Sequence, residues 1–120
     1  MNQKDLKRFR KMLEDKKRRA LLSARKTLAE EATLDTDDLP DEIDLASSEY
    51  QQGMILRLRD REKYFIEKID RAIEKIEGGS FGTCEECGDA ISLKRLEVRP
   101  ETTLCIRCKE EQEKEEKSYG

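Results

Sequence analysis

Two cysteine pairs constrain the fold of this chain more than any other feature of its sequence. Cys84 and Cys87 form one C-x-x-C pair, and Cys105 and Cys108 form the other. The 120 residues contain no further cysteine and no histidine. Each pair places two thiolates on one tight turn, and the spacer can fold back to complete a tetrahedral set of ligands. The sequence therefore predicts one structural zinc ion, Zn2+, held by these four cysteines.

The alternatives for the cysteines are reduced thiols and disulfides. No apolar run follows Met1 that would serve as a secretory or membrane-spanning segment, so we expect a cytoplasmic protein, in a compartment where disulfides are rare. Four thiolate ligands leave no open coordination position for water or substrate. We therefore expect the zinc to hold the shape of a module, and we expect neither enzymatic activity nor membrane association.

The composition limits the size of the core. Only 35% of the residues are hydrophobic, 44% are charged and 5% are aromatic. Such a chain cannot bury a large core, so it is either partly disordered or built from long amphipathic helices plus the metal.

Apolar residues recur at helical spacing in two long segments, from Lys4 to about Ala32 and from about Glu42 to Glu77. The two stripes are, in the first segment, Leu6, Phe9, Leu13, Ala20, Leu21, Ala24 and Leu28, and in the second, Tyr50, Met54, Leu58, Phe65, Ile69, Ala72 and Ile76. Two helices of similar reach joined by a loop pair most simply side by side in opposite directions. The predicted fold is all-α: a long antiparallel coiled-coil hairpin attached to a small four-cysteine zinc module and a C-terminal helix.

The chain divides into two predicted domains. The hairpin covers residues 1–77, with an acidic tip at residues 34–46, and the zinc module with its C-terminal helix covers residues 78–120. Gly78 and Gly79 supply the glycine signal that ends the second long helix. Between the cysteine pairs, residues 90–96 are expected to form a short helix that ends before Pro100. A last, highly charged helix is expected from Ile106 to about Lys117.

Charge is segregated along the chain. Residues 1–29 carry 11 Lys or Arg against 3 Asp or Glu, whereas residues 30–49 carry 9 acids and no base. A segment that repels phosphate follows the basic helix, so sequence-specific binding to DNA is disfavoured. Asp41 and Asp44 can cap the second helix, but capping uses only one or two acids. The remaining acids suggest either an anionic probe for a cationic partner or an ordinary solvated loop.

Three motifs in this order resemble the DksA/TraR family, and the resemblance covers most of the chain. The first is Asp41-Glu42-Ile43-Asp44-Leu45-Ala46, which is similar to the family's D-x-x-D-x-A tip motif. The second is residues 57–62. The third extends from Phe81 through the two cysteine pairs to Lys109, and it includes the segment 95–100.

The resemblance implies a monomeric transcription regulator that inserts its coiled coil into the secondary channel of bacterial RNA polymerase. Asp41, Asp44 and Ala46 match the family's tip positions near the polymerase active site. The resemblance also implies joint action with the alarmone ppGpp. The positions that match polymerase and ppGpp contacts are Arg61, Lys68, Arg99 and Lys109. Ordinary surface charge, or neutralisation of the zinc thiolates, is the alternative for these basic residues.

Two other classes of function remain open from the sequence. One is a coiled-coil scaffold with a zinc cap, whose activity would not depend on the tip acids. The other is a zinc-finger protein that binds nucleic acid, whose affinity for free DNA or RNA would fall steeply with salt.

Overall fold

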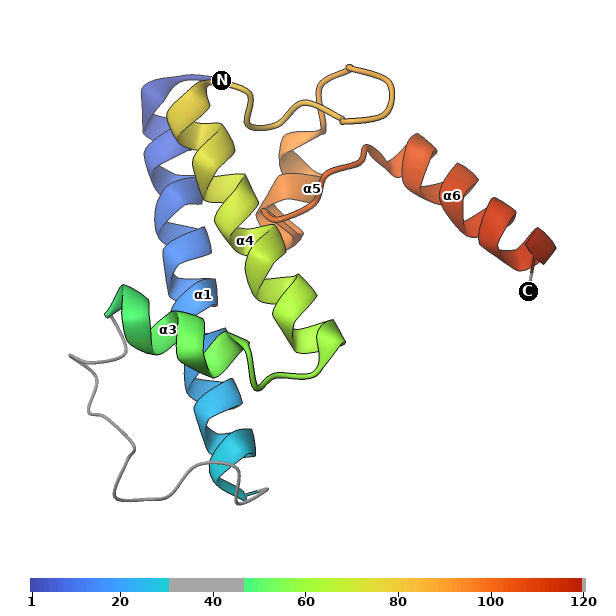
Figure 1. Cartoon of the computed structure of the whole chain (residues 1–120). Coiled ribbons are helices and arrows are strands. Elements are labelled where there is room, and N and C mark those ends of the chain that lie inside the picture. The colour runs from blue at the N-terminus through green and yellow to red at the C-terminus, as the bar shows by residue number, and fades with distance from the viewer. Residues whose placement is uncertain (31–46, 120) are drawn as a thin grey trace. The chain divides into compact units, whose positions relative to one another are not determined.

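The computed structural model of the chain describes residues 1–30 and 47–119, and its regular elements are all helices (Figure 1). Within these residues, extended pairing is limited to one isolated bridge between Thr83 and Ala90. No helix in the described part is both long and apolar enough to cross a membrane. The predicted all-α class is confirmed. The helices are α1 (Gln3–Glu30), α3 (Ser48–Ile55), α4 (Asp60–Gly78), α5 (Leu93–Val98) and α6 (Ile106–Tyr119).

Local hydrogen bonds explain where the helices begin. The Asn2 side chain accepts the amide hydrogen of Asp5 at 2.8 Å at the start of α1. Ser47 and Ser92 cap α3 and α5 in the same way. Side-chain oxygens at these positions satisfy amides that have no partner in the first turn of a helix.

The end of α4 follows the predicted glycine signal. Gly79 has a φ of 84°, and the Ser80 amide donates to the Lys75 carbonyl at 2.9 Å. This is the hydrogen bond of a helix that terminates with glycine in the left-handed region. The short helix and the final helix are also close to their predicted positions.

The second long helix is not continuous, and the prediction of one helix through residue 77 was wrong at residues 56–59. The amides of Arg57 and Leu58 donate to carbonyls only three residues back, which closes the last turn of α3. The Glu62 carboxylate then accepts the Arg59 amide at 3.2 Å and caps α4. Leu58 is 8% exposed, so the interruption keeps this apolar side chain buried. Polar residues already weaken the apolar stripe here in the sequence, but periodicity alone did not reveal the break.

The described contacts divide the chain into two compact units. One unit combines Met1–Glu14 with Lys68–Gly120, and the other is Asp15–Glu67. We call them the zinc-module unit and the arm unit. The core of the arm unit joins α1 to α3 and α4 through Leu21, Ala24, Leu28, Met54, Leu58 and Ile66. The predicted domain boundary at residue 77 stays a prediction.

The zinc-module unit has its own core, in which the hairpin helices and the cysteine segment share one apolar cluster. Its buried members are Phe9 and Leu13 of α1, Ile69 and Ala72 of α4, Phe81, Cys84, Ile91, Leu96 and Cys108. The rings of Phe9 and Phe81 lie 5.5 Å apart between centroids at an angle of 46°. Within this unit α1 and α4 lie side by side and run in opposite directions (Figure 1). The base of the hairpin therefore packs directly on the cysteine module.

The first prediction concerns the shared core of the zinc-module unit. Phe9 is fully buried, so Phe9→Ala should lower the free energy of unfolding by about 3 to 5 kcal/mol. Chemical denaturation monitored by circular dichroism measures this change. Tyr64→Ala is the control, because that aromatic side chain is 58% exposed and its removal should change stability by about 0.5 kcal/mol or less. Equal effects of the two substitutions would contradict a core centred on Phe9.

Candidate metal centre

Two turns bring the four cysteine sulfurs together. All four Sγ atoms lie within 4.8 Å of one another, and the Sγ atoms of Cys87 and Cys105 are 3.8 Å apart. Four sulfurs bound tetrahedrally at about 2.3 Å from Zn2+ lie about 3.8 Å from each other. The cysteines form no disulfide. The predicted cluster is therefore present, and the Cys87–Cys105 pair has the spacing expected around a single zinc ion.

Backbone hydrogen bonds fix the first turn and connect it to the second half of the module. The Gly88 amide donates to the Cys84 carbonyl at 3.0 Å, and the Cys84 amide donates to the Asp89 carbonyl at 2.8 Å. Gly88 has a φ of 78°, which a residue with a side chain rarely adopts. The Glu85 amide donates to the Thr103 carbonyl at 2.9 Å and joins the two cysteine segments.

An arginine that the sequence analysis missed holds the spacer in place. The Arg95 Nε donates to the Leu104 carbonyl at 2.9 Å, directly before Cys105, and its Nη2 donates to Thr102 Oγ1 at 3.3 Å. Both hydrogen bonds are partly buried. A basic residue on the short helix between the pairs was the available signal, but its partners are backbone and loop atoms that only the folded chain brings near.

The thiols of the cluster differ strongly in acidity before a metal binds. Burial raises the pKa of Cys84, but backbone N–H groups of Cys87, Cys105 and Glu86 outweigh it and lower that pKa to about 6. Hydrogen bonding to the Cys105 sulfur, together with burial, raises the pKa of Cys108 to about 12. A metal must therefore displace at least one proton from the cluster when it binds. Zinc affinity consequently falls as the pH falls.

The donor set fits Zn2+ and a structural role. Thiolate ligands favour zinc over calcium or magnesium, which prefer oxygen. Cys84 is 2% exposed and Cys108 is 5% exposed, whereas Cys87 lies at the surface and Cys105 is half-buried. A bound zinc ion would supply a charge centre that links residues 84–87 to residues 105–108. Its four protein ligands would leave no position for catalysis.

The zinc-module unit also carries a group of cations, Lys68, Arg95, Arg99 and Lys109, which we call the basic cluster. Burial lowers the pKa of Lys68, the charge of Glu101 raises it, and the charges of Lys109, Arg99 and Arg95 lower it further. The predicted contacts Lys68, Arg99 and Lys109 are therefore close enough to interact. Glu101 is a buried acid, 6% exposed, that the sequence analysis did not identify.

The other predicted contact residues lie elsewhere. Arg61 is exposed in the first turn of α4 and belongs to the arm unit. Asp41, Asp44 and Ala46 lie outside the described residues, so their roles stay predictions.

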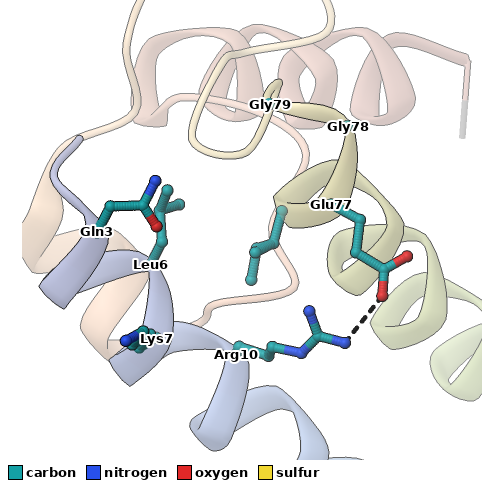
Figure 2. Close-up of a pocket in the computed structure, with 8 residues that line it drawn as sticks. Gln3, Leu6, Lys7, Arg10, Glu77, Gly78 and Gly79 are labelled. Atoms are coloured by element: carbon teal, nitrogen blue, oxygen red, sulfur yellow. Dashed lines mark hydrogen bonds and ion pairs between the residues drawn. The ribbon is translucent and has the colours of Figure 1, made fainter.

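An open groove of about 520 Å³ lies between the first turns of α1 and the end of α4 (Figure 2). Leu6 and Ile76 form its apolar part, and Arg10 extends toward Glu77, with 2.8 Å between Nη2 and Oε1. Hydrogen bonds to Glu14 and Glu77 raise the pKa of Arg10. No cysteine lines this groove, so it is separate from the metal centre.

The second prediction is that the purified protein contains one zinc ion per chain and that a chelator disorders residues 81–109. This segment is too small to fold by hydrophobic burial alone, and structural zinc in such modules contributes on the order of 10 kcal/mol. Metal analysis and amide hydrogen exchange measure both effects. The arm unit serves as the internal control, because its core contains no residue of the module. A metal-free protein with unchanged exchange protection at residues 81–109 would refute the prediction.

Two family models together match nearly the whole chain. The model described as "DnaK suppressor protein DksA, N-terminal domain" matches residues 5–76. The model described as "Prokaryotic dksA/traR C4-type zinc finger" matches residues 79–114, which contain all four cysteines.

Curated relatives also match over most of the chain. The RNA polymerase-binding transcription factor DksA of Caulobacter vibrioides is 38% identical over 119 residues, which are 99% of this chain and 83% of the relative. The protein of that name from Escherichia coli is 38% identical over 109 residues, 91% of this chain and 72% of the relative.

Solved structures agree with this relationship. The transcription factor DksA2 from Pseudomonas aeruginosa has a TM-score of 0.66 and 41% identity, covering 98% of this chain and 89% of that one. The DnaK suppressor protein from Agrobacterium tumefaciens has a TM-score of 0.61 and 32% identity. This match covers 90% of this chain and 91% of that one. The chain therefore belongs to the DksA/TraR family of four-cysteine zinc-finger proteins, as its motifs predicted.

Proposed function

We propose that this protein is a non-enzymatic transcription regulator that binds bacterial RNA polymerase. The observation that carries the proposal is the match over 99% of the chain to a relative named as an RNA polymerase-binding transcription factor. The similarity includes both the helical arm and the zinc module, so it concerns the whole arrangement and not the metal site alone. In this proposal the zinc is structural and the protein acts as a cytoplasmic monomer without reading DNA sequence.

The arm is proposed to enter the secondary channel of the polymerase. α1 has 28 residues, and a helix of that length spans about 42 Å. The arm unit buries six apolar residues in its core and leaves Leu56, Tyr64 and Phe65 exposed, while many cations of α1 remain at the surface. A helical arm whose surface carries many charged side chains suits a water-filled passage lined by protein. The proposal keeps the division into a hairpin at residues 1–77 and a zinc module at residues 78–120.

The acidic segment between α1 and α3 is proposed to reach the catalytic region of the polymerase. Asp41 and Asp44 would act near a catalytic Mg2+ or near basic loops, because carboxylates interact favourably with both. Ala46, with its small side chain, would keep the approach narrow. Arg61, at the start of α4, is proposed to contact the polymerase.

The basic cluster is proposed to bind ppGpp together with the polymerase. Lys68, Arg99 and Lys109 come from α4, the spacer and α6, and the fold brings their charges into mutual range. Arg can bind a phosphate with two parallel hydrogen bonds, and Lys adds a mobile charge. The electrostatic repulsion among these three cations decreases when a polyanion binds between them. The polymerase would supply the other walls of the site and exclude water, which strengthens these contacts.

The third prediction tests the acidic tip. Asp44→Asn should abolish most of the regulatory effect on transcription while leaving polymerase affinity and thermal stability nearly unchanged, because Asn keeps the shape but removes the charge. In vitro transcription at matched occupancy measures the effect. Asp37→Asn is the matched control, since it removes one charge from the same acidic segment outside the motif. If both variants regulate normally, the scaffold alternative gains support.

The fourth prediction tests the nucleotide. Lys68→Ala should weaken the ppGpp site of the polymerase complex by about 1 to 3 kcal/mol, because one charge-assisted contact is lost. The affinity of ppGpp is compared for polymerase alone, for the complex and for the variant complex. Lys94→Ala removes an exposed lysine from α5 and should have no effect. A complex with no additional ppGpp site would refute the nucleotide role but not polymerase binding. Steeply salt-dependent binding of the isolated protein to free DNA would instead favour a nucleic-acid binder.

A further inference from the structure

The segment that leads into the second cysteine pair has no regular secondary structure. It extends from residue 99, after the end of α5, to Cys105, before the start of α6. Pro100 and Glu101 are buried, and residues 102–105 are half-buried. A metal ligand at the end of such a segment is held in place only if other contacts fix the backbone that precedes it.

Arg95 of α5 supplies these contacts through three linked hydrogen bonds. Its Nε donates to the Leu104 carbonyl at 2.9 Å, and its Nη2 donates to Thr102 Oγ1 at 3.3 Å. The Thr102 hydroxyl donates to the same Leu104 carbonyl at 3.2 Å. The Leu104 carbonyl and the Cys105 nitrogen belong to one planar peptide group. Fixing that carbonyl therefore also orients the backbone of the ligand Cys105.

Arg95 itself starts from a fixed position. Its amide donates to the Ser92 side chain at 3.2 Å in the first turn of α5. The next residue, Leu96, is fully buried in the core that also contains Cys84 and Cys108. The helix that carries the guanidinium is thus anchored beside two other members of the metal centre.

A second contact holds the same segment from the opposite side. The Thr103 carbonyl accepts the Glu85 amide at 2.9 Å, which ties it to the first cysteine turn. Two successive carbonyls, those of Thr103 and Leu104, are therefore held by the first cysteine turn and by α5. Losing the hydrogen bonds of Arg95 would leave the approach to Cys105 fixed from one side only.

We propose that Arg95 is a positioning residue of the metal centre, which sets the place of Cys105 through Leu104 and Thr102 and thereby increases the affinity for zinc. The proposal concerns the protein before it meets any partner, so it does not depend on the proposed function.

The chemistry of the guanidinium explains why an arginine suits this position. Its N–H groups form a rigid, planar fork that can donate to two acceptors at once, whereas a lysine donates from a single atom. Residues that hydrogen-bond to metal ligands typically change metal affinity about 10-fold to 100-fold when they are replaced. Arg95 acts through a peptide group and not on the sulfur, so we expect an effect of about 10-fold, at the lower end of that range.

The experiment compares the full-length wild type with Arg95→Met, Arg95→Lys, Thr102→Val and the double variant of Arg95→Met with Thr102→Val. Lys94→Met is the matched control, because it removes one positive charge at the neighbouring, exposed position of α5. Competition with a chromophoric chelator measures zinc affinity. Co2+ bound by thiolates absorbs visible light, so the spectrum of the Co2+ form reports the arrangement of the sulfurs. Amide hydrogen exchange of the zinc-loaded proteins locates the backbone that loosens.

We expect zinc affinity to fall about 10-fold in Arg95→Met and by less in Arg95→Lys and Thr102→Val. The double variant should bind zinc about as weakly as Arg95→Met, because both residues belong to one network. Exchange should increase at residues 102–109 and not at the base of the hairpin, and the Co2+ spectrum of Arg95→Met should differ from that of the wild type. If Arg95→Met does not fold, Thr102→Val decides, because it removes only the hydroxyl.

Three results would overturn the proposal. The first is a zinc affinity of Arg95→Met within twofold of that of Lys94→Met. The second is wild-type affinity in Arg95→Lys, which would show that positive charge alone is sufficient. The third is an equal loss of exchange protection throughout the zinc-module unit, which would assign Arg95 a general packing role.

Discussion

The meeting of four cysteine sulfurs is the constraint on which the rest of the zinc-module unit depends. Two of these cysteines, Cys84 and Cys108, are also members of the apolar core that contains Phe9 and Ile69. The same side chains therefore serve as metal ligands and as packing groups. Any change that separates the cysteines also opens the contact between the module and the base of the hairpin, so metal binding and helix packing are expected to be cooperative.

The large number of charged residues limits how many side chains this small structure can bury. The chain is 44% charged, and its cores are narrow clusters between a few helices. Arg95 and Glu101 are exceptions, since they are ionisable residues placed inside the spacer, and Arg95 uses its hydrogen bonds to replace lost hydration. Exposed ion pairs such as Arg8 with Glu97, at 3.3 Å, contribute little stability by comparison. The spacer is therefore held by partly buried hydrogen bonds and by the cysteine ligands at its ends more than by surface charge.

The interruption between α3 and α4 shows how packing can override local preference. Residues 56–59 contain neither glycine nor proline, so no residue there forbids a helix. The chain nevertheless leaves the helix, buries Leu58 and leaves Leu56 76% exposed. Burying one leucine against α1 compensates for the helical hydrogen bonds that are lost. Periodicity correctly placed Leu58 and not Leu56 on the buried stripe, but it did not reveal that the helix is interrupted there.

The sequence by itself determined the helical class, the four-cysteine centre, the glycine end of α4 and the family, because each depends on short-range spacing or on residue chemistry. Tertiary structure alone decided the break at residues 56–59, the burial of Glu101, the hydrogen bonds of Arg95 and the ion pair of Arg107 with Asp89. These features join residues through three-dimensional contacts whose free energies depend on burial. A surface arginine such as Arg107 has no distinguishing pattern in the sequence, and its neighbour Asp89 is brought close only when the two cysteine segments meet.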